Sequence, residues 1–264
     1  MKIFRLVLKV FRLLGLFLFC TLSAQKKLPF DSLNLREVKD FFADDYGSFY
    51  LYKNRDFSFT KYDSLGRQHG QMMLAVPFKI QNVQNPLNIV LFSENTQEMK
   101  FIDQNLNEVQ KIDLRKFGFI KMAFAEDLQQ IWLLDESAKR LVQYNFREDK
   151  IIKSLSMNFS FDEVRDMLVY EDKVYLIFKN EIQVYNFKSE KKLSLPIENP
   201  LKLRRENDRI VIISKNKISL LTETSLTALF LAPSAEIVDK NSDAYFELTA
   251  GKLYLYRLQD DLKL

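Results

Sequence analysis

Short apolar segments separated by polar turns recur along the chain and predict β-strands. Glu181 to Tyr185 and Lys217 to Leu221 alternate polar and apolar residues, the period-two pattern of a strand with one buried face. Ile210 to Ile213 is instead a continuous β-branched run, as expected for a strand buried on both faces. The pattern therefore predicts an all-β protein.

The same succession of strands repeats along the chain. Each unit has a short apolar strand, a polar turn, a denser apolar strand, a tight turn and an alternating strand. The units begin near Val38, Phe78, Ile120, Val164, Leu201 and Ile237. A period of about 40 residues with four strands per unit is typical of propellers. The sequence predicts a six-bladed β-propeller with four-stranded antiparallel blades.

One repeat position, just before the third strand, carries turn-forming residues. They are Asn54, Asn180, Asn216 and Gly251. Asn and Gly tolerate the positive φ of tight hairpin turns. We interpret these residues as turn residues and not as a polar site.

The last unit lacks a fourth strand, and the N-terminal region contains a segment that matches one. Only Arg257 to Leu264 follow the third strand of the last unit. Gln25 to Phe30 resembles Glu190 to Leu195, the fourth strand of another unit. We expect the N-terminal strand to close the last blade and to remove an open sheet edge.

Residues 1–24 have the order of a secretory signal peptide. The basic residues Lys2, Arg5, Lys9 and Arg12 precede the apolar run from Leu13 to Leu22, and Ser23 and Ala24 follow. This run is shorter than the roughly 20 residues that cross a bilayer. We expect cleavage after Ala24, which leaves residues 25–264 as a single propeller domain.

Cys20 lies inside the apolar run. Lipid attachment would require a small residue before it, and Phe19 stands there. We therefore interpret Cys20 as part of the signal peptide. The expected location is the periplasm or the periplasmic face of the outer membrane, with peripheral membrane association left open.

Charge excludes one class of partner. The full chain carries a net charge of +4, but removing the four basic residues of the signal leaves 35 basic against 35 acidic residues. A formally neutral domain is not expected to bind nucleic acid through its overall charge. The mature part also has no cysteine, so it forms no disulfide.

The repeat organisation resembles exported bacterial propellers of the broad NHL, YVTN and PQQ-like kind. The resemblance covers nearly the whole mature chain, but only as architecture. The Trp-Asp pairs of WD40 repeats and the Gly-rich turns of NHL and PQQ-like repeats are absent. The resemblance therefore implies no functional residues.

Few residues offer catalytic chemistry. The chain has one histidine, His69, in a segment from Gly66 to Gly70 that we expect to be an exposed loop. Without a mature cysteine or a Gly-x-Ser-x-Gly motif, a Cys–His pair, a serine triad and most zinc sites are disfavoured. Trp132 lies in a second strand and is expected in the core. We expect no catalytic residues, no metal and no cofactor.

Acidic pairs recur between the first and second strands of several units. They are Asp44-Asp45, Glu126-Asp127 and Glu171-Asp172. Oxygen ligands suit calcium. Without EF-hand spacing, we interpret these residues as solvated turn acids.

Basic residues recur at the start of the innermost strands. They are Lys39, Lys79, Lys121, Arg165 and Lys202, which we place at one repeat position in five of the six units. A ring of like charges around a propeller channel would be costly unless it is hydrated or matched by an anion. It is therefore a candidate site for an anionic ligand or an acidic segment. The alternative is an exposed strand end, where Asp40 and Asp166 pair locally with these cations.

Three functions follow from these patterns. The leading hypothesis is a non-catalytic binding or scaffold module that contacts another envelope protein through a propeller face. The alternative is a sensor or carrier of an anionic ligand at the basic channel mouth. A propeller hydrolase or lyase is the third, and it lacks the metal ligands or histidines that such chemistry uses.

Overall fold

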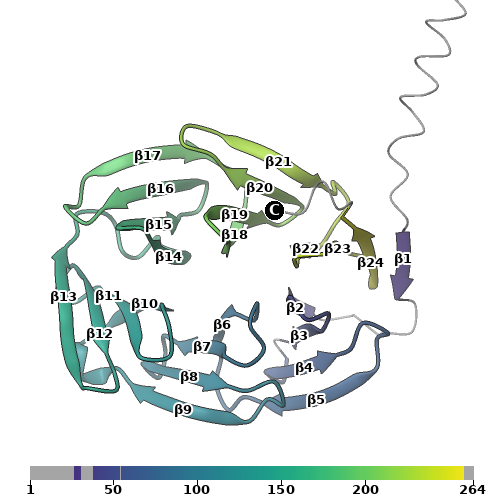
Figure 1. Ribbon diagram of the computed structural model, residues 1–264, viewed down its shortest axis with the longest axis horizontal. Coiled ribbons are helices and arrows are strands. Elements are labelled where there is room, and N and C mark those ends of the chain that lie inside the picture. The colour runs from purple at the N-terminus through teal and green to yellow at the C-terminus, as the bar shows by residue number, and fades with distance from the viewer. Residues whose placement is uncertain (1–26, 31–37, 54, 259–264) are drawn as a thin grey trace, which may run out of the picture.

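The computed structural model describes residues 27–30, 38–53 and 55–258. The expected signal peptide, residues 1–24, lies outside this part of the chain. The described residues form six four-stranded antiparallel sheets arranged as a ring, which confirms the six-bladed β-propeller (Figure 1). A short 3-10 helix, η1 (Arg115–Phe117), follows the second sheet. No helix within the described ranges has the length and apolar character to span a bilayer.

The blades are numbered in chain order. Blade 1 contains β2 (Val38–Ala43), β3 (Phe49–Lys53), β4 (Ser58–Tyr62) and β5 (Gln68–Met73). Blade 2 contains β6 (Lys79–Asn82), β7 (Ile89–Ser93), β8 (Glu98–Ile102) and β9 (Glu108–Asp113). Blade 3 contains β10 (Ile120–Ala125), β11 (Gln130–Asp135), β12 (Arg140–Asn145) and β13 (Lys150–Ser156).

The second half of the ring repeats this order. Blade 4 contains β14 (Asp166–Tyr170), β15 (Lys173–Ile177), β16 (Glu181–Asn186) and β17 (Lys191–Pro196). Blade 5 contains β18 (Pro200–Glu206), β19 (Arg209–Ser214), β20 (Lys217–Leu221) and β21 (Leu226–Leu231). Blade 6 contains β22 (Ile237–Lys240), β23 (Ala244–Thr249), β24 (Lys252–Arg257) and the N-terminal strand β1 (Lys27–Phe30).

The first strand of each blade lies nearest the ring axis, and the fourth lies at the periphery (Figure 1). Because every blade has this order, all first strands run in the same direction along the axis. We call the side where they begin the start face. The side where they turn into the second strands is the end face.

The second strands pack between neighbouring blades. In β11, Ile131 and Leu133 belong to the hydrophobic cluster between blades 2 and 3, whereas Trp132 and Leu134 belong to the cluster between blades 3 and 4. Alternate residues of a strand point to opposite faces, so a strand sandwiched between two blades needs apolar residues at every position. This explains the continuous apolar runs in the sequence and confirms Trp132 as a core residue.

The N-terminal strand closes the ring, as predicted. β1 pairs antiparallel with β24, and Lys27 lies opposite Tyr256 in the register. Blades 1 and 6 also share a hydrophobic cluster that includes Phe41 and Phe246, whose ring centroids lie 5.3 Å apart. The chain therefore joins its two ends within one sheet and leaves β24 with a partner on each side.

One expectation about local structure was wrong, and a second was confirmed only in part. His69 lies in the outermost strand β5 and not in a loop, although its side chain is exposed. Asn180, Asn216 and Gly251 lie in the turns directly before third strands, as expected, but of these three only Gly251 has a positive φ, of 72°, and Asn54 lies outside the described residues. In blades 1 to 3 the positive φ falls on the residue directly before the third strand, which is Phe57, Gln97 or Lys139. In these blades the hairpin loop between the second and third strands has four residues. The last of them adopts the positive φ with which the chain turns back into the third strand.

Candidate functional site

The strand register places the five basic residues at two adjacent positions, so the expectation of a single position was wrong. Lys79 pairs with Phe92 and Lys202 with Ile213, while Asp40 pairs with Tyr52. Phe92, Ile213 and Tyr52 each lie opposite the second residue of the third strand of their own blade. Lys79, Lys202 and Asp40 therefore occupy equivalent positions of the repeat.

We call this shared position of Asp40, Lys79 and Lys202 the inward position. The other three basic residues each precede it by one residue. They are Lys39, Lys121 and Arg165, which come directly before Asp40, Met122 and Asp166. Lys39 and Lys121 fall where the ladder with the second strand is interrupted by a bulge. An offset of one residue turns a side chain to the other side of a strand. The sequence alone does not show the strand register, so the five cations looked equivalent.

The inward position forms a layer of six residues across the channel. From blade 1 to blade 6 they are Asp40, Lys79, Met122, Asp166, Lys202 and Ile237. The order of carboxylate, lysine and apolar residue occurs twice around the ring. This layer therefore carries two positive and two negative groups and has no net charge.

The two lysines of this layer form ion pairs that bridge blades two apart. Lys79 Nζ lies 2.7 Å from Asp166 Oδ1 and 3.6 Å from the sulfur of Met122, which lies in the intervening blade. Lys202 Nζ lies 2.8 Å from Asp40 Oδ1. Asp40 and Asp166 thus bind lysines across the channel, and the alternative of local pairing was also wrong.

A second carboxylate stabilises Lys202. Its ammonium lies 3.3 Å from Asp239 Oδ2 in blade 6. Burial opposes the charged form of Lys202, but the carboxylates of Asp239 and Asp40 outweigh it and raise the pKa of this lysine. Lys202 therefore stays protonated in the channel.

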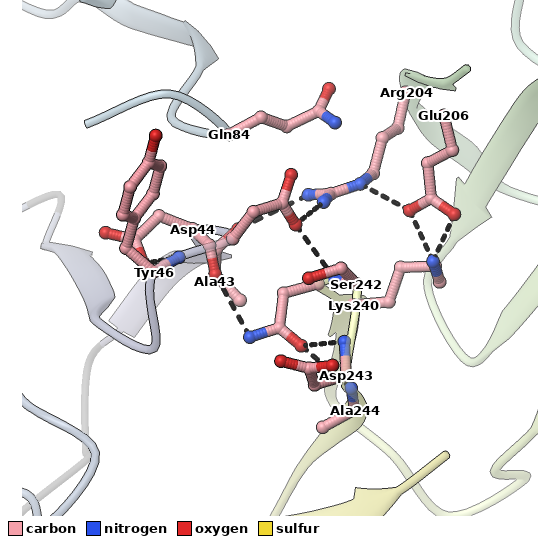
Figure 2. A network of polar contacts seen from close by, with 12 residues as sticks. Ala43, Asp44, Tyr46, Gln84, Arg204, Glu206, Lys240, Ser242, Asp243 and Ala244 are labelled. Carbon is pink, nitrogen blue, oxygen red and sulfur yellow. Dashed lines mark hydrogen bonds and ion pairs between the residues drawn. The ribbon is translucent and has the colours of Figure 1, made fainter. Parts of the chain in front are cut away.

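A second polar network closes the ring at the end face (Figure 2). The guanidinium of Arg204 in blade 5 donates to Asp45 and, at 3.3 Å, to the carbonyl oxygen of Ala43 in blade 1. Its Nε donates to Glu206 at 2.7 Å, and Glu206 also binds Lys240 of blade 6. Arg204 and Lys240 are almost fully buried, and burial lowers the pKa of Lys240 against the opposing effect of Glu206. These contacts join three blades where the chain closes on itself.

Backbone-directed contacts complete this closure. Asn241 Nδ2 donates to the carbonyl oxygen of Asp44 at 3.0 Å, and the amide of Ser242 donates to Asp45 Oδ1 at 2.8 Å. The carboxylate of Asp44 accepts from the hydroxyl of Tyr50 at 2.9 Å. The acidic pair Asp44-Asp45 is therefore structural.

A cavity opens at the start face between blades 1, 2 and 3. It has a volume of about 350 Å³ and brings together Lys39, Lys79 and Lys121, three of the five predicted site residues. Lys121 pairs with Glu94 at 2.8 Å, and Lys39 Nζ lies 5.6 Å from the centre of the Tyr52 ring. Arg165, which is exposed, and Lys202 do not line this start-face cavity.

The end face contains a larger groove that the sequence did not indicate. Two adjoining cavities of about 510 Å³ and 700 Å³ form it. They share Gln81, Asn82, Asn85, Phe124, Ala125, Glu126 and Arg205. Leu87 and Leu128, which are 61% and 56% exposed, also line this end-face groove. Only the assembled ring brings these residues together, since four blades contribute them.

Acids outnumber bases in this groove. Glu126, Asp127, Asp166, Glu171 and Asp172 line it, against Lys153 and Arg205, and Asp166 is already paired with Lys79. The two cations lie over aromatic rings, Lys153 at 4.5 Å from the centre of Phe187 and Arg205 at 4.6 Å from that of Tyr170. Glu126 accepts from the indole N–H of Trp132 at 2.8 Å. Within the described part of the chain, no group of three or more His, Cys, Asp or Glu residues could hold a metal ion.

Gln81 is the least satisfied polar side chain of the groove. It lies at a bulge of β6, and both its amide oxygen and its amide nitrogen are buried without a hydrogen-bond partner. An unpaired buried polar group costs about 1–3 kcal/mol, so a bound group that reaches this amide would recover part of that cost.

Comparisons with known proteins identify the architecture. No protein-family model matches the chain, and no curated protein matches it. A virginiamycin B lyase from Staphylococcus aureus superposes with a TM-score of 0.54 at 12% identity, covering 89% of this chain and 99% of the lyase. A streptogramin B lyase superposes with a TM-score of 0.52 at 13% identity, covering 90% of this chain and 88% of the other. BamB from Moraxella catarrhalis gives 0.44 at 10% identity, covering 83% and 82%.

The feature shared with the two lyases is the β-propeller fold. At such low identity the likeness extends to the fold alone, and a fold does not determine an activity. The functional argument therefore rests on this chain's own faces.

Proposed function

We propose that this propeller is a non-catalytic binding module that docks another envelope protein through its end face. The observation that carries this proposal is the end-face groove. Its two adjoining cavities, of about 510 Å³ and 700 Å³, extend over four blades, as a docking surface for a protein segment does. The exposed leucines Leu87 and Leu128 lie in two neighbouring turns at its edge.

The groove chemistry suits an extended segment with basic and apolar side chains. The surplus of carboxylates, among them Glu171 and Asp172, favours cationic groups. Side-chain amides such as Asn82, Asn85 and Gln81 can pair with the backbone of an extended peptide. Hydrophobic clusters between the blades hold these turns on a rigid ring, so little ordering entropy is lost on binding.

The position of the histidine supports a non-catalytic role. His69 lies in the peripheral strand β5 and lines neither the start-face cavity nor the end-face groove. Its ring nitrogen lies 3.2 Å from Asp63, a partly buried residue of the same blade. A general acid or base would have to reach a bound substrate.

Affinity purification from the native envelope, followed by mass spectrometry, tests the proposal. We expect a stoichiometric protein partner with the native sequence and with Val109→Lys, a matched change at an exposed peripheral residue. Leu128→Lys should lose that partner, because it replaces an apolar contact of the groove with a positive charge that repels a basic segment. Equal retention by both variants would contradict docking in the groove. A copurifying small molecule without any protein partner would favour a carrier.

A second candidate function is the carriage or sensing of an anionic ligand at the start face. Lys39, Lys79, Lys121, Arg165 and Lys202 are the proposed ligand residues. The start-face cavity favours this function because it gathers three of them around one opening. Lys79 and Lys202 already bind carboxylates, so an incoming anion would meet the exposed members first.

We also propose that the protein is exported, with residues 1–24 as a cleaved signal peptide. The motivation is the order of basic, apolar and small residues at the N-terminus. The proposed location is the periplasm or the periplasmic face of the outer membrane. Intact-mass measurement of the native protein should give a chain that begins at Gln25. A chain that retains Lys2 to Leu22, or one lipidated on Cys20, would overturn this expectation.

A further inference from the structure

The start-face cavity combines an apolar lining with a cationic rim. Phe42, Phe78 and Phe92 line it together with Met122 and Ile80. Its volume of about 350 Å³ lies near the lower end of the 300–1,000 Å³ typical of small-molecule sites. A ligand that fills it should therefore be small and have an apolar body.

The charges around the cavity favour one negative charge on the ligand. Three lysines and two carboxylates line it, which leaves a net charge of +1. Lys121 is paired with Glu94, and Lys79 with Asp166 across the channel. Lys39 has no carboxylate partner among the residues that the structure describes and lies over the Tyr52 ring. Its ammonium is therefore the cation most available to a ligand.

A buried hydroxyl is a further observation at this cavity. Tyr52 lines the cavity and is 2% exposed, and its hydroxyl is buried without a hydrogen bond of normal geometry. Burial raises the pKa of Tyr52, an effect that the backbone of Phe78 partly offsets. A small shift of this ring on binding would give the hydroxyl an acceptor and recover part of its desolvation cost.

We propose that the start-face cavity binds a small monocarboxylate with a flat apolar body, such as an aryl-substituted acid. The carboxylate lies at the rim beside Lys39 and Lys121, and the apolar body packs against Phe42 and Phe78. A phosphate or sulfate dianion would exceed the net charge of the cavity and would leave its apolar lining unfilled. This inference rests on the second candidate function and is independent of docking at the end face.

Titration calorimetry on the purified protein tests the ligand class with four probes. Phenylacetate carries both the charge and the apolar body. Acetate carries only the charge, sulfate is a dianion, and phenethylammonium carries the body with the opposite charge. We expect saturable binding of phenylacetate and at least 10-fold weaker binding of the other three.

Two matched variants locate the site. Lys39→Gln should weaken phenylacetate binding about 10-fold. Lys188→Gln, which removes an exposed lysine in the β16–β17 turn, should leave it unchanged. If Lys39→Gln binds phenylacetate as the native protein does, the site assignment fails. If sulfate or acetate binds as well as phenylacetate, the ligand class fails while the anion-carrier function survives. If no anion binds, both fail, and the docking proposal stands on its own test.

Discussion

Lys79 in blade 2 and Asp166 in blade 4 form an ion pair of 2.7 Å that passes over Met122 of the blade between them. Lys202 of blade 5 pairs with Asp40 of blade 1, and Asp239 of blade 6 lies 3.3 Å from the same ammonium. Both pairs join blades that share no hydrophobic interface. They fill the channel with matched charges and leave the two faces of the ring as the surfaces available for binding.

A double-mutant cycle on Lys79→Gln and Asp166→Asn measures the cross-channel pair. We expect a coupling free energy of about 1–3 kcal/mol, because both side chains are mostly shielded from water. Asparagine at position 166 keeps an acceptor for the amide of Leu203. The exposed pair Lys192 and Glu190 is the control and should give less than about 1 kcal/mol in urea unfolding. Equal couplings for the two pairs would show that the channel pair is as solvated as a surface pair.

Arg204 should be the most sensitive charged residue of the closure. Arg204→Met leaves Asp45 and Glu206 without their common partner, and breaking a buried pair costs about 3–5 kcal/mol. We expect a fall in Tm of roughly 10 °C for a domain of this size. Arg205→Met, which changes the exposed neighbour, should cost less than about 1 kcal/mol. Similar losses for both variants, measured by calorimetry, would mean that the network does not hold the ring closed.

The fold was predictable from the sequence because each blade leaves a local signature. The alternating run from Glu181 to Tyr185 and the continuous run from Ile210 to Ile213 reflect how many faces of each strand are buried. Even the closure by β1 followed from the similarity between Gln25 to Phe30 and a fourth strand elsewhere. Such patterns depend on contacts within one blade or with the next blade. They can therefore be recognised in the sequence without a three-dimensional structure.

Tyr245 should make stability depend on alkaline pH. Burial and the nearby Glu206 raise its pKa to about 12. In the unfolded chain this tyrosine ionises near pH 10, so the stability that it contributes is present below pH 10 and is lost between pH 10 and 12. Tyr245→Phe should reduce that loss by about 1–2 kcal/mol in urea unfolding at pH 8 and pH 11. Tyr46→Phe, at a residue 72% exposed, should not change it. If the free energy of unfolding falls equally between pH 8 and pH 11 in the native protein and in both variants, the assignment of this loss to Tyr245 is contradicted.

The N-terminal strand should stabilise the ring measurably. A chain that begins at residue 31 lacks β1 and exposes the edge of β24. We expect its Tm to lie several degrees below that of a chain that begins at residue 25, for a loss of a few kcal/mol. Thermal unfolding by circular dichroism gives the comparison. If the two values of Tm coincide, β1 contributes nothing to closure.

The candidate sites were less predictable because they depend on register and on distant blades. The strand register sets Lys39 and Lys121 one position apart from Lys79 and Lys202, and nothing in the local sequence reveals that difference. The cross-channel partners of Lys79 and Lys202, Asp166 and Asp40, lie 87 and 162 residues away in sequence. The end-face groove likewise joins Gln81 to Arg205 only when the ring closes. Recurrence identified the basic residues but not their partners.

Site-specific photo-cross-linking in the native envelope tests the proposed docking function most directly. A photoreactive amino acid at position 128 lies in the end-face groove, and one at position 109 lies at an equally exposed place on the peripheral strand β9. Docking predicts a single cross-linked protein partner from position 128, and its yield should fall when Glu171 and Asp172 are changed to lysine. Position 109 should give no such product. The absence of a product at position 128, or the same product from both positions, would contradict docking through the end face.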